Sequence, residues 1–188
     1  MADVRVTPET FSLVNFDAAR IAEITSKLAG EVGLPDDAVV EIEVDEKAPS
    51  TRVRTESTDP VRLRIEGGAI EETTAPRTLS DRLTADVIGR LLFRVADRRS
   101  AGFADAPADE ELDLAQQTAW DSYSMGRLER LGYDVRKPRR LYHFRNRHGF
   151  SDVADQAFER LWAGDGLTWA EIDAICAETA EARAAVSA

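Results

Sequence analysis

The sequence predicts an α+β fold: a small, mostly antiparallel sheet of three to five strands with an N-terminal helix, followed by a four-helix C-terminal half. Two observations support this class. Between residues 38 and 66, apolar side chains alternate with charged ones, which is the period of a half-buried strand. After Pro76 the apolar side chains recur every three or four residues, which is the period of a helix. Strands followed by helices are typical of α+β proteins.

The first predicted elements are a short strand over residues 11–16 and a helix that follows it. Asp17 is the predicted N-cap, and Gly33, with Pro35 behind it, is the predicted end of the helix. The apolar positions of this helix are Ile21, Ile24, Leu28 and Val32.

Three strands are predicted next, over residues 38–46, 51–55 and 61–70. Gly67 and Gly68 mark a turn or bulge in the last of them. The outward residues of the first strand are acids, whereas those of the other two are mostly arginines. Since opposite charges on neighbouring strands attract, we expect one face of the sheet in the core and one charged face in solvent.

Two long amphipathic helices are predicted over residues 79–99 and 109–131, and Gly132 ends the second one. Ser151 begins a further helix, and Thr168 with Glu171 forms a capping box for the last. Residues 136–150 are predicted to connect these helices. We expect a sheet region over residues 1–100 and a helical region over 101–188 packed on it, together forming one compact domain.

Composition limits the function. The 188 residues carry a formal net charge of −11, so binding to nucleic acid or to an anionic membrane would need a local basic patch. The one cysteine, Cys176, excludes an internal disulfide and any multi-cysteine metal site, and fits a reducing compartment. The sequence has no signal-peptide pattern and no apolar run that would span a membrane, so a cytoplasmic location is expected.

Common catalytic motifs are missing. The chain has no phosphate-binding GxxxxGK[ST] loop, no GxGxxG and no GxSxG. We therefore predict no catalytic residue, no cofactor and no metal. His143 and His148 could share a metal ion only if carboxylates such as Asp152 or Asp155 completed its coordination. Cys176 lies on the apolar side of its predicted helix and is expected to be a core residue rather than a nucleophile.

The segment 136–150 concentrates the cations of this acidic chain. It holds six of the 24 Lys and Arg residues and both histidines, and it has no acid. Acidic stretches flank it, at residues 105–121 and 152–181. Two interpretations follow: a clamp, in which the arginines pair with carboxylates of the flanking helices, or an anion site beside the start of the next helix. The candidate ligand-binding residues are Arg140, Tyr142, His143, Arg145, Arg147 and His148.

These observations favour a non-catalytic binding or structural module. The expected partner is an unknown protein, a small anionic ligand or a second copy of the chain forming a homodimer, whereas nucleic acid and membrane are disfavoured. The alternative is an enzyme that acts on a small anionic substrate, with His148 or His143 as acid and base. Arg145 and Arg147 would hold that substrate.

The element order of the first half resembles the small zincin-type metallopeptidase domain. In that family a helix and strands precede an active helix that carries HExxH. Here the corresponding elements are the helix over residues 16–33, the strands over 38–46 and 61–70, and the helix over 84–98, which has no histidine. The resemblance therefore implies a non-catalytic relative. Residues 158–175 also resemble a helix-turn-helix, but the second helix is acidic, which disfavours DNA recognition.

Overall fold

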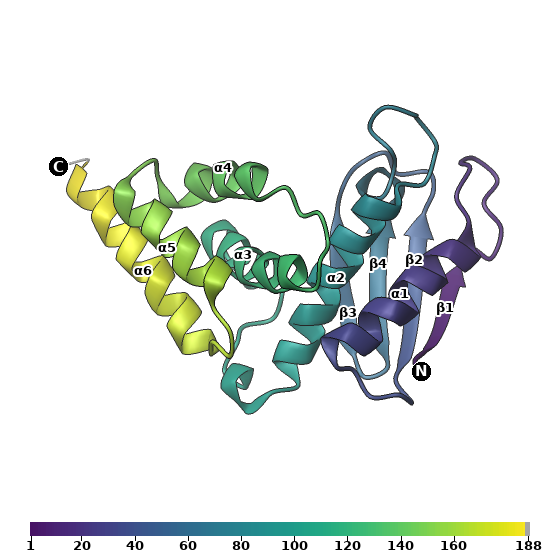
Figure 1. Ribbon diagram of the computed structural model, residues 1–188, viewed down its shortest axis with the longest axis horizontal. Helices are drawn as coiled ribbons and strands as arrows, with labels where there is room; N and C mark the ends of the chain where they lie inside the picture. Colours follow the sequence, from purple (N-terminus) through teal and green to yellow (C-terminus); the bar gives the residue numbers. More distant parts are fainter. Residues whose placement is uncertain (187–188) are drawn as a thin grey trace. The chain divides into compact units, whose positions relative to one another are not determined.

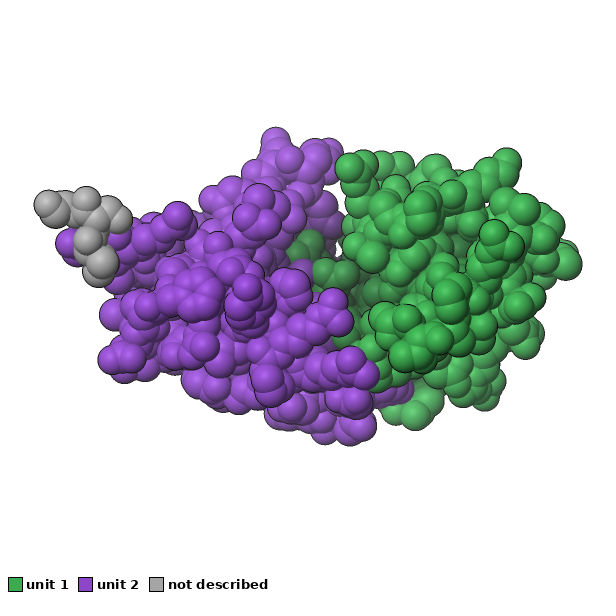
Figure 2. Space-filling view, turned by 90° about the horizontal axis from the view of Figure 1, so that it is seen from above, with its two compact units in different colours: residues 1–96 green, residues 97–188 purple. Residues whose placement is uncertain are grey.

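The computed structural model describes residues 1–186. The chain divides into two compact units, residues 1–96 and residues 97–188 (Figure 2). The first unit contains the sheet and the second contains the C-terminal helices. The α+β class predicted from the sequence is confirmed. The expectation that the whole chain forms one compact domain stays a prediction.

Unit 1 is built on a four-stranded mixed sheet with the order β1-β2-β4-β3. β1 pairs with β2 and β2 pairs with β4, both in parallel, while β3 is antiparallel to β4. The strands are β1 (Asp3–Thr7), β2 (Val39–Asp45), β3 (Val53–Thr58) and β4 (Val61–Glu66). The number of strands agrees with the prediction, whereas the mostly antiparallel arrangement was wrong.

Two features of the chain produce the parallel pairs. Helix α1 (Ala18–Val32) connects β1 to β2 and returns the chain to the same edge, which is how parallel neighbours are joined. β3 takes the outer position, so β2 and β4 become neighbours with the same direction. The predicted strand at residues 11–16 was also wrong: within it only Asn15 forms an isolated bridge, and β1 precedes it.

The two faces of the sheet differ as the alternating pattern predicted. Helices α1 and α2 (Asp81–Arg98) lie on the same face (Figure 1). On the other face Glu41 contacts Arg62 at 2.7 Å and Glu43 contacts Arg64 at 3.2 Å. The buried side chains of the central strands are Val40, Ile42, Val44, Val61, Leu63 and Ile65.

Unit 2 is a bundle in which α3 contacts each of the other three helices. The helices are α3 (Leu114–Arg130), α4 (Lys137–His148), α5 (Asp152–Ala163) and α6 (Trp169–Val186), preceded by the short 3-10 helix η2 (Ala101–Phe103). The largest fully buried side chains here are Trp120, Tyr123, Phe144 and Phe158. At Gly126 the backbone of α3 meets α5 so closely that an added Cβ would lie 2.0 Å from the Trp162 carbonyl oxygen.

The residues that begin and end the helices behave as predicted. The carboxylate of Asp17 accepts from the first turn of α1, and Gly33 ends that helix with a left-handed φ of 85°. Thr168 and Glu171 form the predicted capping box, because each side chain accepts from the backbone N–H of the other residue. None of the helices in residues 1–186 is long and apolar enough to cross a membrane.

The segment expected to be a connector is instead a helix, α4, so that interpretation was wrong. Pro138 lies in its first turn, where the missing N–H of proline removes no helical hydrogen bond. The inward side chains are Phe144 and His148, four residues apart and both buried. Because one of these two buried side chains is a histidine, the sequence shows no repeated apolar positions from which the helix could be recognised.

Candidate functional site

Two of the six bases of the basic segment clamp α4 to α5. Lys137 contacts Glu159 at 2.7 Å. Arg145 binds Asp155 with two parallel hydrogen bonds, Nε to Oδ1 at 2.7 Å and Nη2 to Oδ2 at 2.6 Å. These bonds hold the pKa of Asp155 below its usual range. The pairing that the clamp interpretation predicted is therefore present for Lys137 and Arg145.

The remaining arginines and His143 follow another side of α4. They form the outer stripe, which we define as Arg136, Arg139, Arg140, His143 and Arg147. Their spacing of three or four residues places them on one side of the helix, over about 16 Å at 1.5 Å per residue. Among residues 1–186, Arg139 and Arg147 have no ion-pair partner. Part of the positive charge of this stripe is therefore uncompensated.

The pKa of His143 responds to the positive charges of the outer stripe. Partial burial lowers its pKa, and the charges of Arg139, Arg140 and Arg147 lower it further. Partial burial and the cations around it thus both favour the neutral imidazole. An anion bound at this place would oppose that effect and raise the pKa of His143.

A groove of about 280 Å³ runs between α3 and α4 beside the outer stripe. We call it the α3–α4 groove. It combines apolar, hydroxyl and carboxylate groups on one wall with cations and an amide on the other. Its lining residues are Leu114, Thr118, Asp121 and Ser122 of α3, and Arg140, His143, Asn146 and Arg147 of α4.

Exposed aromatic side chains lie next to the outer stripe. Tyr142 is 57% exposed and Phe150 is 67% exposed. Their rings meet edge to face with centroids 6.1 Å apart, and the ring of Tyr142 lies 6.3 Å from that of His143. Removing large apolar side chains from water lowers the free energy, so this exposed pair favours contact with another molecule.

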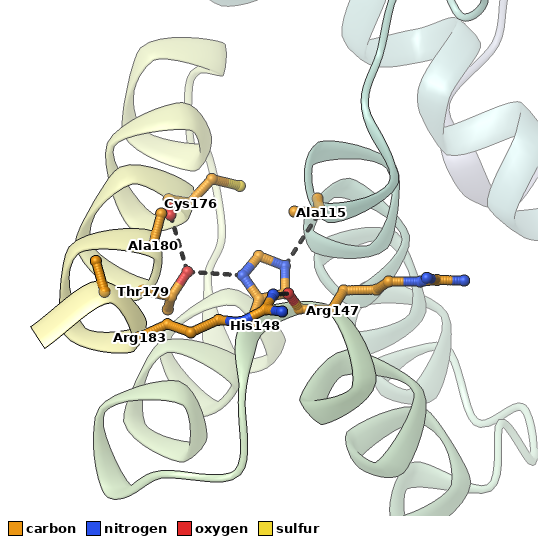
Figure 3. Close-up of a pocket in the computed structure, with 8 residues that line it drawn as sticks. Ala115, Arg147, His148, Cys176, Thr179, Ala180 and Arg183 are labelled. Atoms are coloured by element: carbon orange, nitrogen blue, oxygen red, sulfur yellow. Dashed lines mark hydrogen bonds between the residues drawn. The ribbon is translucent and has the colours of Figure 1, made fainter. Parts of the chain in front are cut away.

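His148 belongs to the interior instead, where its ring lies between Ala115 and Thr179 (Figure 3). Its ring stacks on Phe144 with centroids 3.8 Å apart. Nε2 lies 3.0 Å from the carbonyl oxygen of Ala115, which can only accept, so Nε2 carries a proton. Nδ1 lies 2.7 Å from the hydroxyl oxygen of Thr179, which also lies 2.9 Å from the Cys176 carbonyl oxygen. When the ring is neutral, the one proton of this hydroxyl therefore serves either Nδ1 or that carbonyl oxygen. Burial lowers the pKa of His148, so the neutral ring is favoured.

A second hollow of about 380 Å³ lies beside His148. Arg183 on its wall donates to the backbone oxygen of Arg147 at 3.2 Å, and the Arg147 side chain extends away from Thr179 (Figure 3). Burial raises the pKa of Cys176, which also lines the hollow, to about 12. A thiol with so high a pKa is a poor nucleophile, as expected for a core residue.

The six candidate residues are thus divided among three surroundings. Arg140, His143 and Arg147 line the α3–α4 groove, and Tyr142 lies beside it. Arg145 is bound to Asp155, and His148 is buried. Among residues 1–186 no group of three or more His, Cys, Asp or Glu side chains could hold a metal ion.

Sequence reasoning missed the α3 wall of the groove. Its members are separated by three or four residues, which places them on one side of a helix. This spacing is visible in the sequence. Predicting the groove also requires knowing which side of α4 faces α3, and residues 137–148 were predicted to be a connector rather than a helix.

No protein-family model matches the chain, and neither a curated protein nor a solved structure matches it significantly. The resemblance to zincin-type domains therefore stays a prediction.

Proposed function

We propose that this protein is a non-catalytic interaction module that binds an acidic segment of a partner protein on the outer face of α4. The observation that carries the proposal is the exposed Tyr142–Phe150 pair beside an outer stripe with uncompensated arginines. Aromatic residues and arginine are the residue types enriched in protein interfaces. A cationic stripe about 16 Å long suits an extended acidic segment better than a single small anion.

Charge supports a protein partner over nucleic acid. The whole chain has a formal charge of −11, so the surface outside the stripe is acidic and would repel a long polyanion, whereas a short acidic segment meets only the stripe. The α3–α4 groove would hold one carboxylate of the segment beside Arg147. We extend the proposal to a reducing, cytoplasmic setting because the one cysteine is a buried free thiol.

The enzymatic alternative has less support. Both ring nitrogens of His148 are engaged in hydrogen bonds, and Arg145 is engaged by Asp155. His143 stands among arginines on an exposed surface, and no carboxylate within residues 1–186 is bound to its ring. As a relative of zincin-type domains the chain would be a non-catalytic one, because α2 has no histidine.

Binding of fluorescein-labelled hexaglutamate, followed by fluorescence anisotropy at low salt, tests the proposal. The double variant R139Q/R147Q should lose binding, whereas K137Q/R145Q removes the same charge from the clamp side and should retain most of it. Circular dichroism checks that both variants are folded.

The comparison with a second polyanion, a labelled oligothymidylate, tests the preference for protein. Equal binding of both probes, or equal loss in both double variants, would contradict the proposal. Replacing Tyr142 with alanine should weaken hexaglutamate binding less than removal of the arginines, because this peptide offers the ring only methylene groups.

A further inference from the structure

A separate hollow in unit 1 lies where the parallel strands end. Strands β1, β2 and β4 run in the same direction, so the loops that follow them meet at one edge of the sheet (Figure 1). In open sheets with parallel strands, ligands bind outside the carboxyl ends of the strands. The loops after these three strands enclose about 410 Å³, a volume in the usual range of small-molecule sites. We call this hollow the strand-end pocket.

The strand-end pocket carries two cations, Lys47 and Arg77. Both side chains are exposed, and neither has an ion-pair partner among residues 1–186. They come from different loops, Lys47 after β2 and Arg77 from the segment between β4 and α2. Each of these two cations is able to bind an oxygen of an anionic ligand, although the hollow also carries the carboxylates of Glu46 and Glu71.

The two carboxylates of the pocket are held by other donors. Glu46 accepts from the backbone N–H of Ser12 at 2.9 Å and of Leu13 at 2.7 Å. These bonds lower the pKa of Glu46 despite some desolvation. Glu71 accepts from the backbone N–H of Arg77 at 2.9 Å. Glu46 thus joins the loop after β2 to the loop after β1, and Glu71 closes the segment between β4 and α2 on itself. Neither carboxylate forms an ion pair with Lys47 or Arg77.

Arg77 has an unfavourable backbone conformation for its residue type. It follows Pro76 in a turn closed by a hydrogen bond from Thr78 N–H to the Ala75 carbonyl oxygen at 3.2 Å, and its φ is 63°. Glycine or asparagine is preferred at this turn position, because a left-handed conformation is unfavourable for other residues. An arginine at this position suggests that its side chain has a role outside the fold.

The rest of the pocket is compact and apolar. Gly68 has no room for a side chain, since a Cβ there would lie 2.0 Å from the Pro49 carbonyl oxygen. Leu13, which is 49% exposed, stands at the pocket. Val14, Ala48 and Pro76 complete an apolar wall. A ligand here would place an apolar body against this wall and its charged group between the two cations.

From these features we propose that the strand-end pocket binds a small phosphate monoester, with its dianionic phosphoryl group between Lys47 and Arg77 and a compact apolar body against Leu13. This site goes beyond the proposed function: it lies in a different unit from α4 and is expected to work independently of the outer stripe.

Titration of the ¹⁵N-labelled full chain with phenyl phosphate, inorganic phosphate and phenol tests the proposal. Phenyl phosphate should shift the amide resonances of Gly67 and Gly68, with inorganic phosphate weaker and phenol without effect. No shift with phenyl phosphate up to about 10 mM, or an equal response to phenol, would overturn the proposal.

Arg77→Gly provides the sharpest variant, because it removes the guanidinium and relieves the left-handed strain. It should melt at or above the wild-type temperature, yet bind phenyl phosphate about tenfold or more weakly. Lys27→Gln, the same charge change on α1, should leave the affinity unchanged. If Arg77→Gly failed to fold, Lys47→Gln would carry the same expected loss of affinity. Wild-type affinity in the folded variant would refute the site.

Discussion

Truncation of His148 to alanine should be among the most damaging single changes in unit 2. The side chain is 3% exposed and lies face to face with Phe144. Its removal breaks the hydrogen bonds to the Ala115 carbonyl oxygen and to the Thr179 hydroxyl, each of which contributes about 0.5–1.5 kcal/mol. The lost ring leaves a cavity worth about 2 kcal/mol, because truncation of the larger Phe costs about 3–5. Together these terms predict a loss of about 3–5 kcal/mol in the free energy of unfolding.

Urea denaturation at pH 7.5, followed by circular dichroism, measures this loss. His143→Ala is the matched control, because it removes an exposed histidine from the same helix and should change the free energy by less than about 0.5 kcal/mol. If His148→Ala were no more destabilised than His143→Ala, the interior network around His148 would be wrong.

The same residue gives a pH dependence. The pKa of His148 in the folded protein is below the ordinary value of about 6.5, so below that pH the unfolded chain binds a proton that the folded chain does not. The wild type should therefore lose stability between pH 7.5 and 5.5, and His148→Gln should lose less over this interval. His143, whose pKa is also lowered, contributes in the same direction. Stability that rose on acidification would refute this assignment.

Three further predictions concern other contacts of the fold. Gly126→Ala places a Cβ 2.0 Å from a backbone oxygen of α5 and should lower the free energy of unfolding by at least about 2 kcal/mol. The Cβ of Gly30→Ala in α1 meets nothing within 4 Å, so this variant should raise the free energy of unfolding by about 0.5–1 kcal/mol. Urea denaturation compares the two variants. Arg145→Ala should lower the melting temperature and let the pKa of Asp155 rise toward its ordinary value, measured by carboxyl NMR. Cys176 should react with Ellman's reagent slowly in the native protein and rapidly in urea, because burial raises its pKa to about 12. Equal destabilisation by the two glycine variants, an unchanged Asp155 pKa or a fast native thiol would each contradict the corresponding contact.

Local signals predicted most of the elements, because local chemistry determines them. Asp17 and Gly33 marked the two ends of α1, and Thr168 marked the start of α6. The alternation in β2 and β4 correctly separated a core face from a charged face. These features depend on residues within a few positions of one another, so a sequence can reveal them.

The order of the strands could not be read in this way. β3 is adjacent to β4 at the edge, and β2 pairs with β4 across the intervening segment, which local periodicity does not specify. β1 has five residues, of which only Val6 is buried, so its pattern was too short to be recognised.

The sequence indicated residues 136–150 as the candidate binding segment, but it did not show which role each residue has. On α4 the bases alternate between the side that pairs with α5, such as Arg145, and the side that faces the α3–α4 groove, such as Arg147. The side on which each base lies follows from its position in the helical repeat, which a predicted connector does not have. The clamp and the anion site were therefore competing interpretations, whereas different sides of α4 can serve each of them.

The pKa of His143, measured by NMR from its imidazole Cε1–H resonance, tests the central claim most directly. Because burial and three arginines lower it, the pKa in the free protein should lie below about 6.5, and R139Q/R147Q should raise it. Saturation with hexaglutamate should also raise it in the wild type, and less in that variant. A His143 pKa that responded neither to the loss of the arginines nor to the peptide would contradict an anion-binding surface on α4.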